Sequence, residues 1–232
     1  MTERRRIYLL RHGQVAYFAD GKPLPPDDVV LTEEGRRESR ITAEALSGIR
    51  FDRVVTSGLN RTVETARIVV PEVEPESWPD LRELESGRLA DLEDAEEAFL
   101  RVWSGVVPVD RQFLGGETMG SLLDRVVPAL ERLVADPDWD SALVVVHGGV
   151  IRALLSFALT GERSFLGNFE ISPASLSVLD VGPQAAPKAA SPPSLGAHDW
   201  VVRAVNVTPY DLAHTRTRLR TMEELWAQYR NT

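Results

Sequence analysis

The chain has 232 residues, which is enough for one large domain or two small ones with a substantial core. Its 43% hydrophobic and 26% charged residues are typical of a globular protein, and its net charge of −9 without a long basic block argues against binding to nucleic acid. The absence of cysteine excludes disulfides and zinc–cysteine sites. No stretch approaches the ~18 apolar residues of a membrane helix, and the apolar run after the basic N-terminus is too short for a signal peptide. We therefore expect a cytoplasmic protein.

The first predicted element is a strand over residues 7–10, which are all apolar and indicate burial on both faces of a parallel sheet. The strand ends abruptly in Arg11, His12 and Gly13. Ligands of open α/β sheets bind at the carboxyl ends of the strands, so these residues are candidates for a binding site. The alternative at this point is a surface loop that happens to contain a histidine.

A loop, a helix, a second strand and a second helix are predicted next. Residues 15–30 contain glycine and three prolines and form a loop, and a helix follows from an N-cap at Thr32 to about Gly48. A strand over 51–56 leads into a helix over 60–70. Arg61 lies in the first turn of that helix, where a cation opposes the helix dipole, and this placement favours a functional role over a solvated surface arginine.

The middle of the chain is predicted to be mainly helical. Glu83 and Glu85 precede a glycine turn and, taken alone, read as solvated surface carboxylates. A helix is predicted over 92–107, and another over 119–135 with a kink or break at Pro128.

The pattern of the opening strand then recurs. Residues 141–146 form a second apolar strand that ends in His147 and Gly148, and a helix is predicted over 150–159. Two of the four histidines therefore stand at equivalent strand ends. If both strands belong to one sheet, the imidazoles of His12 and His147 share a crevice, and we favour function over coincidence.

The last segment is predicted to add an antiparallel edge to the sheet. A strand over 175–181 and a returning strand over 198–206 flank a stretch rich in alanine, proline and serine, which we interpret as a flexible hairpin insertion at 182–197. A short helix over 221–229 is expected to expose two aromatic side chains, candidates for packing or for a homodimer contact: Trp226 and Tyr229.

Together the candidate residues form a compact cationic pocket. Guanidinium groups of Arg11 and Arg61 match the oxygens of a phosphate, so a small phosphorylated molecule is the expected ligand. A neutral His12 can attack phosphorus in line if its other ring nitrogen donates to a backbone carbonyl. A carboxylic acid must then protonate the leaving group, and water must cleave the phosphohistidine. This chemistry requires no metal or cofactor, and the sequence contains no recognisable metal-binding pattern.

The same residues belong to short motifs that resemble the histidine phosphatase superfamily, also called phosphoglycerate mutase-like. The motifs occur in the family's order between about Arg6 and Leu159. They are Leu10-Arg11-His12-Gly13-Gln14, the helix start Leu31-Thr32-x-x-Gly35, the stretch from Ser57 through Arg61 to Ala66, Leu81-Arg82-Glu83-x-x-x-Gly87, Gly115-Gly116-Glu117-Thr118, and Val146-His147-Gly148-Gly149.

The resemblance implies a single three-layer α/β/α domain over 1–232, with a central, mostly parallel sheet that carries an antiparallel edge. It implies that His12 is phosphorylated, that His147 takes part in catalysis and that Glu83, four residues before the glycine, is the proton donor. It places the substrate's phosphate on the remaining matched residues: Arg11, Gly13, Gln14, Arg61, His147 and Gly148. The chain departs from the family's pattern at several places, and these departures concern the identity of the substrate. They are Tyr17-Phe18, Gly58, Thr62, the insertion, and a C-terminal extension from about residue 210.

The expected function is a metal-independent phosphomonoesterase. Mutases of the family typically carry asparagine where this chain has Gly149, which makes a phosphoglycerate mutase the second candidate. A non-catalytic phosphate-binding module is the third, because a fold does not determine function. Sugar phosphates, phosphoglycerate, nucleotides and phosphorylated cofactor precursors all remain open as substrates, and the residues that select among them are expected in 15–30 and 89–114.

Overall fold

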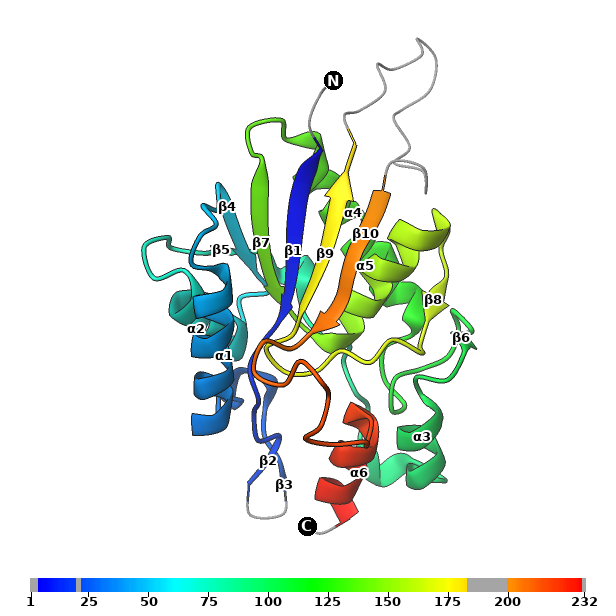
Figure 1. Cartoon of the computed structure of the whole chain (residues 1–232). Coiled ribbons are helices and arrows are strands. Elements are labelled where there is room, and N and C mark those ends of the chain that lie inside the picture. The colour runs from blue at the N-terminus through cyan, green and yellow to red at the C-terminus, as the bar shows by residue number, and fades with distance from the viewer. Residues whose placement is uncertain (1–3, 20–21, 183–199, 231–232) are drawn as a thin grey trace, which may run out of the picture.

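The computed structural model describes residues 4–19, 22–182 and 200–230. Its centre is a six-stranded sheet with the strand order β10-β9-β1-β7-β4-β5 (Figure 1). Strands β1, β7, β4 and β5 are parallel, whereas β9 pairs antiparallel with both β1 and β10, which confirms the predicted mixed sheet. The strands are β1 Arg5–Arg11, β4 Arg53–Thr56, β5 Glu76–Ser77, β7 Ser141–Val146, β9 Leu176–Val181 and β10 Trp200–Val207.

Helices cover both faces of the sheet and make the predicted three layers (Figure 1). Side chains of β7 alternate between two cores: Leu143 and Val145 lie in the cluster with α1 and α2, and Val144 lies in the cluster with α4 and α5. The predicted N-cap is confirmed, since the Thr32 hydroxyl accepts the Gly35 N–H at 3.0 Å. The helices are α1 Glu33–Leu46, α2 Asn60–Val69, α4 Met119–Ala135, which runs through Pro128, and α5 Gly148–Thr160.

The predicted helix over 92–107 is wrong for most of its length. Only Ala95–Arg101 is helical (α3), starting where the Asp94 carboxylate accepts the Glu97 N–H, and Val106–Val107 forms a strand (β6). Beyond α3 the chain turns so that the Trp103 ring stacks on two other aromatic rings, Phe113 and Phe165, at 5.4 and 5.3 Å. The apolar spacing therefore serves contacts with other segments rather than one helical stripe.

Short elements gather near the carboxyl ends of β1, β7 and β4, at the bottom of Figure 1. The 15–30 loop contains a small hairpin and one helical turn, and further short strands and turns lie in and after the 76–107 region. Those near the sheet edge at which the candidate residues were predicted are β2 Phe18–Ala19, β3 Lys22–Pro23, η1 Pro26–Asp28, η2 Pro79–Leu81 and η3 Leu89–Asp91. Strand β8, Phe165–Leu166, instead pairs with β6 and lies beside α5 at the side of the molecule (Figure 1).

The C-terminal helix, α6 Thr221–Arg230, packs against α3. The rings of Trp226 and Tyr229 each lie 5.6 Å from the ring of Phe99. Both aromatics are half-buried by this contact, so the expectation that they are exposed is wrong. Their predicted role in packing is confirmed, and a homodimer contact through them stays a prediction. The predicted insertion at 182–197 lies, except for its first residue, outside the described residues.

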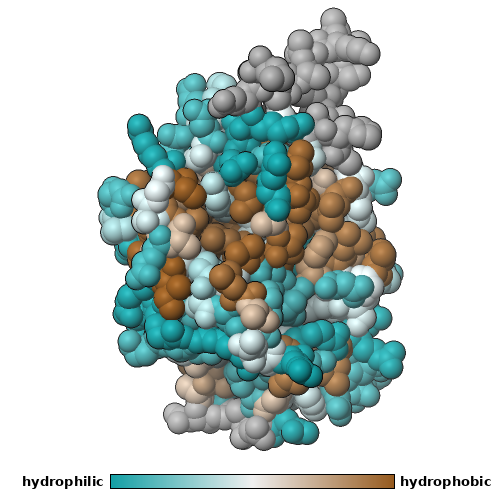
Figure 2. Space-filling view, in the orientation of Figure 1, coloured by the Kyte–Doolittle hydropathy of each residue, from teal (hydrophilic) through white to brown (hydrophobic). Residues whose placement is uncertain are grey.

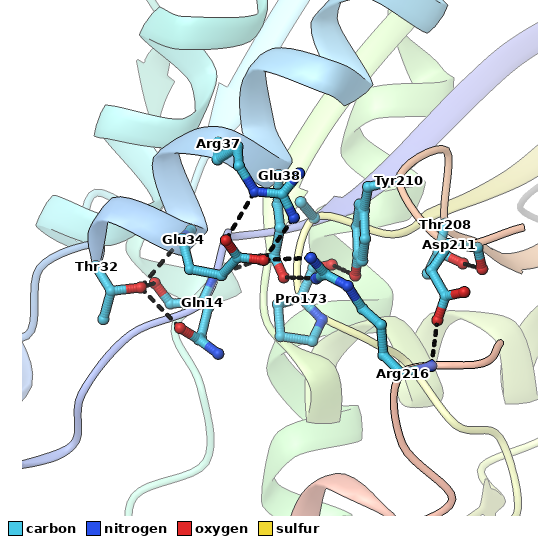
Figure 3. A network of polar contacts seen from close by, with 12 residues as sticks. Gln14, Thr32, Glu34, Arg37, Glu38, Pro173, Thr208, Tyr210, Asp211 and Arg216 are labelled. Atoms are coloured by element: carbon cyan, nitrogen blue, oxygen red, sulfur yellow. Dashed lines mark hydrogen bonds and ion pairs between the residues drawn. The ribbon is translucent and has the colours of Figure 1, made fainter.

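A polar network ties the segment after β10 to α1 (Figure 3). Arg216 donates to the Glu38 carboxylate at 3.0 Å and also pairs with Glu34, while the Tyr210 hydroxyl donates to the Pro173 carbonyl. Glu38 is buried and accepts the Gln14 N–H at 3.1 Å, and its burial raises the pKa of its carboxyl group. The C-terminal segment is therefore connected to the loop that follows β1.

The face of the molecule that shows β9 and β10 is apolar across its middle and hydrophilic above and below (Figure 2). Strands β1 and β7 are largely buried, whereas the valines of β10 at 201, 202, 205 and 207 are only half-buried. The sheet is therefore covered less completely at this edge. Among the described residues, no helix has the length and apolar character needed to span a membrane.

Candidate active site

Three neighbouring parallel strands bring the candidate residues together. Strand β1 delivers His12, β7 delivers His147 and β4 delivers Ser57, and the register pairs Arg11 with Val146 at the edge. The rings of His12 and His147 lie 5.2 Å apart between centroids, with their planes at 63°. The two imidazoles, 135 positions apart in the chain, therefore share one site.

The His12 ring is buried with a defined hydrogen position. Its Nδ1 lies 2.8 Å from the Gly13 carbonyl oxygen. Because a carbonyl only accepts hydrogen bonds, Nδ1 must carry the hydrogen of the neutral ring and Nε2 must carry the lone pair. Burial, followed by the charges of Arg61 and Arg11, holds the pKa of His12 well below its usual value. The ring is therefore neutral at physiological pH, as a nucleophile requires.

The His147 ring has the opposite hydrogen position. The Thr62 hydroxyl donates to the Leu59 carbonyl at 2.8 Å, so the Ser57 hydroxyl donates to Thr62 at 3.0 Å and accepts from Nε2 of His147 at 2.8 Å. Nδ1 then carries the lone pair, and it is buried without a hydrogen-bond partner in the described structure. Burial, with Arg61 next, holds the pKa of His147 well below its usual value.

A bound dianion would raise the pKa of His147 again. Negative charge beside an imidazole favours its protonated form, and the orphaned Nδ1 is the atom that can take the proton. His147 can therefore become an imidazolium that donates a hydrogen bond to a bound oxyanion. The sequence motif contained Ser57 and Thr62, but nothing in the motif indicated that their hydroxyl groups form a chain of hydrogen bonds to His147.

Arg11 and Arg61 are 5% and 3% exposed and are held mainly by neutral groups. Arg11 donates to the Ile171 carbonyl at 2.6 Å and to the Thr221 hydroxyl at 3.1 Å, and Arg61 donates to the Pro26 carbonyl at 2.8 Å. Within the described residues, Nε of each arginine is buried without an acceptor. Both guanidinium groups therefore keep donors for an anion, and the site is cationic although the chain is acidic overall.

The Glu83 carboxylate lies at the N-terminus of α5, the helix that begins directly after His147. It accepts the Gly149 N–H at 3.1 Å and the Leu84 N–H at 3.0 Å. A Cβ atom at Gly149 would lie 2.4 Å from Oε1 of Glu83, so only glycine leaves room for this carboxylate without a shift. Glu85 is exposed, and of the two acidic residues it is Glu83 whose carboxylate is bonded to α5.

The structure leaves the other predicted phosphate contacts as predictions. The Gly13 N–H donates to the Thr65 hydroxyl at 3.1 Å, and the exposed Gln14 side chain accepts from the Thr32 hydroxyl at 2.8 Å. Gly148 is the first residue of α5 and lies against the Arg11 side chain. Its backbone is therefore near the guanidinium, while the Gly13 N–H already has a partner.

One buried cation was missed by the sequence reasoning. Arg152 of α5 is 2% exposed, lies 3.8 Å from the Glu170 carboxylate, and places its guanidinium 4.9 Å from the centre of the Trp103 ring. Burial lowers its pKa to about 10, which still leaves it charged at neutral pH. The sequence does contain a signal for this residue, because Arg152 is the one charged residue in the apolar stretch 150–159. Across the described ranges, no group of three or more His, Asp or Glu side chains could hold a metal ion.

The chain is similar to proteins that are named as phosphatases or as phosphoglycerate mutases. The chain is 30% identical over 187 residues to the adenosylcobalamin/alpha-ribazole phosphatase of Salmonella typhimurium, covering 76% of this chain and 90% of that protein. It is 32% identical over 160 residues to a protein of Serratia proteamaculans named as a probable phosphoglycerate mutase, covering 66% and 74%. The native structure of mycobacterial glucosyl-3-phosphoglycerate phosphatase shares the fold, with a TM-score of 0.68, 24% identity, and coverage of 88% of this chain and 99% of that chain.

The family model of the histidine phosphatase superfamily (branch 1) matches residues 7–188, which includes all the candidate site residues. The fold, the pair of strand-end histidines and the sequence relatives agree, and the chain belongs to the histidine phosphatase superfamily.

Proposed function

We propose that the protein is a metal-independent phosphomonoesterase that hydrolyses a small phosphorylated metabolite through a phosphohistidine on His12. The observation that carries the proposal is the pairing of two buried neutral imidazoles with two partly unpartnered guanidinium groups. A phosphate monoester satisfies these donors and compensates their charge. We place the reaction in the cytoplasm, where small phosphorylated metabolites occur.

In the first step Nε2 of His12 attacks phosphorus in line. A P–N bond forms as the P–O bond to the leaving group breaks, and the leaving oxygen takes a proton from the Glu83 carboxyl group. Arg11 and Arg61 bind the phosphoryl oxygens, and the protonated His147 donates to them through Nδ1. The Gly13 carbonyl accepts the Nδ1 hydrogen of His12 and stabilises the positive ring.

In the second step a water molecule replaces the released alcohol. The Glu83 carboxylate takes a proton from the water as its oxygen attacks phosphorus. The P–N bond breaks, and its electron pair returns to Nε2, which restores the neutral His12. Inorganic phosphate leaves, and Glu83 is again protonated for the next turnover.

A phosphoglycerate mutase is the second candidate, because a relative at 32% identity carries that name. Gly149 favours the phosphatase, since mutases of the family typically have asparagine there. Incubation with 3-phosphoglycerate separates the two. Isomer interconversion faster than release of inorganic phosphate would favour the mutase.

Trapping of the intermediate tests the proposal. A substrate carrying labelled phosphate is mixed with the enzyme and quenched, and the label is expected on His12 in an acid-labile, base-stable form. His12→Ala is expected to abolish labelling and hydrolysis of an aryl phosphate. The matched control is His214→Asn, which changes an exposed histidine and is expected to retain both. Hydrolysis by His12→Ala at the wild-type rate would refute the mechanism.

A further inference from the structure

The proposed acid, Glu83, lies on a segment with little regular structure of its own. The turn η2 ends at Leu81, and the chain continues without helix or strand to Gly87. Leu81 and Leu84 point into the core, but the outer side of the segment borders an open cavity of about 530 Å³. Packing therefore holds this segment from one side only, although the acid must be placed to within a fraction of an ångström.

Arg125 of α4 binds the segment from the cavity side. Its Nη1 donates to the carbonyls of Asp80 and Arg82 at 2.8 and 2.6 Å, and its Nη2 donates to the carbonyl of Glu83 at 3.2 Å. Its Nε and Nη2 also donate to the two carboxylate oxygens of Glu117 at 2.9 and 2.8 Å. These bonds use all five N–H hydrogens of the Arg125 guanidinium, so each one is donated either to this segment or to Glu117.

Glu117 holds the same segment by its backbone as well as orienting Arg125. Its N–H donates to the Glu85 carbonyl at 2.8 Å, and its carboxylate accepts the Glu85 N–H at 3.3 Å. The Arg125 and Glu117 side chains are 24% and 15% exposed, which limits the screening of their charge by water. The backbone of the acid segment is thus hydrogen-bonded to one ion pair at four residues: Asp80, Arg82, Glu83 and Glu85.

We propose that Arg125, oriented by Glu117, is a positioning residue that places Glu83 for proton transfer to the leaving group. Glu83 is held at both ends: Arg125 binds its backbone carbonyl, and the N-terminus of α5 binds its carboxylate. Loss of the Arg125 guanidinium removes the hydrogen bonds to the carbonyls of Asp80, Arg82 and Glu83, and the carboxyl group can then follow the loosened segment away from the substrate. The inference rests on the proposed phosphatase reaction and adds a residue that does not touch the substrate.

The test compares substrates that differ in their need for an acid. p-Nitrophenyl phosphate releases a stabilised phenolate, whereas glycerol 3-phosphate releases an alkoxide that must be protonated. The ratio kcat/KM is used because it reports the steps up to release of the alcohol and not the later hydrolysis of phosphohistidine. Arg125→Lys is expected to lower kcat/KM by about 10- to 100-fold for glycerol 3-phosphate and by less than about threefold for p-nitrophenyl phosphate.

Three further variants make the result specific. In a Glu83→Gln background, Arg125→Lys is expected to have little additional effect, since both act on one proton transfer. Glu117→Gln keeps the shape of the pair but removes its charge, and is expected to shift the substrate ratio in the same direction. Arg132→Lys is the matched control on α4. The Arg132 guanidinium donates to the Asp80 carboxylate and lies over the Trp78 ring, and its replacement is expected to leave the ratio unchanged.

The outcomes separate this inference from the function on which it rests. Equal losses for both substrates in Arg125→Lys and Glu117→Gln, or additive losses in the double variant, would overturn the positioning role alone. Wild-type protein that hydrolyses neither substrate would overturn the proposed phosphatase and the inference with it. Thermal unfolding midpoints of each variant identify any protein that fails to fold, and Glu117→Gln then carries the comparison.

Discussion

The two buried imidazoles make the stability of the protein depend on pH in a predictable direction. His12 and His147 have pKa values well below the ordinary value in the folded protein, because burial disfavours the charged ring. In the unfolded chain each returns to a pKa of about 6.5. Below that pH the unfolded chain binds more protons than the folded protein. The stability is therefore complete above about pH 6.5 and is lost as the pH falls.

The magnitude follows from the two titrations. Between about pH 7.0 and about pH 5.5, an imidazole that stays neutral in the folded state loses about 1.2 kcal/mol of stability, and the pair loses about 2.5 kcal/mol. Glu38 acts in the opposite sense. Because its pKa is raised, the folded protein binds a proton there at a higher pH than the unfolded chain does. Its contribution cancels when variants that retain it are compared.

The assay is urea unfolding at both pH values in a buffer without phosphate. The wild type is expected to lose about 2.5 kcal/mol more than the His12→Asn/His147→Asn double variant over this range, whatever the difference in their absolute stability. Added phosphate is expected to reduce the loss, because it binds the folded state and favours the protonated His147. An equal pH dependence in wild type and double variant would show that the rings are not buried and neutral together.

Three further predictions concern the site. Gly149→Ala places a methyl group against the Glu83 carboxylate, so kcat/KM for alkyl phosphates is expected to fall about 10- to 100-fold in steady-state assays. An unchanged kcat/KM would show that the carboxylate is not needed there. Ser57→Ala removes the acceptor of the His147 Nε2 hydrogen. The loss of transition-state stabilisation is expected to be about 1 kcal/mol, or roughly a fivefold fall in kcat/KM in steady-state assays. Full activity would exclude a role for the hydrogen bond between Ser57 and His147. Treatment with EDTA is expected to leave hydrolysis unchanged, because guanidinium groups supply the charge compensation, and activity restored only by added metal would contradict this.

The sequence by itself determined the elements on which the site is built. The apolar strands before His12 and His147 and the N-cap at Thr32 depend on local patterns, because burial and capping act within a few residues. Arg61 could be selected for the same reason, since its conflict with the helix dipole is local. The convergence of the two histidines followed only on the condition that both strands belong to one sheet, and the parallel pairing of β1 with β7 fulfils it.

Tertiary structure alone decided the features that depend on contacts between distant segments. The spacing over 92–107 imitates a helix, but its residues pack against other parts of the chain. The proton position on His147 depends on a hydroxyl chain from α2, and the anchoring of Glu83 depends on Arg125, which is 42 positions away. Hydrogen bonds of this kind are directional and leave no periodic trace in a sequence, so only the folded chain reveals them.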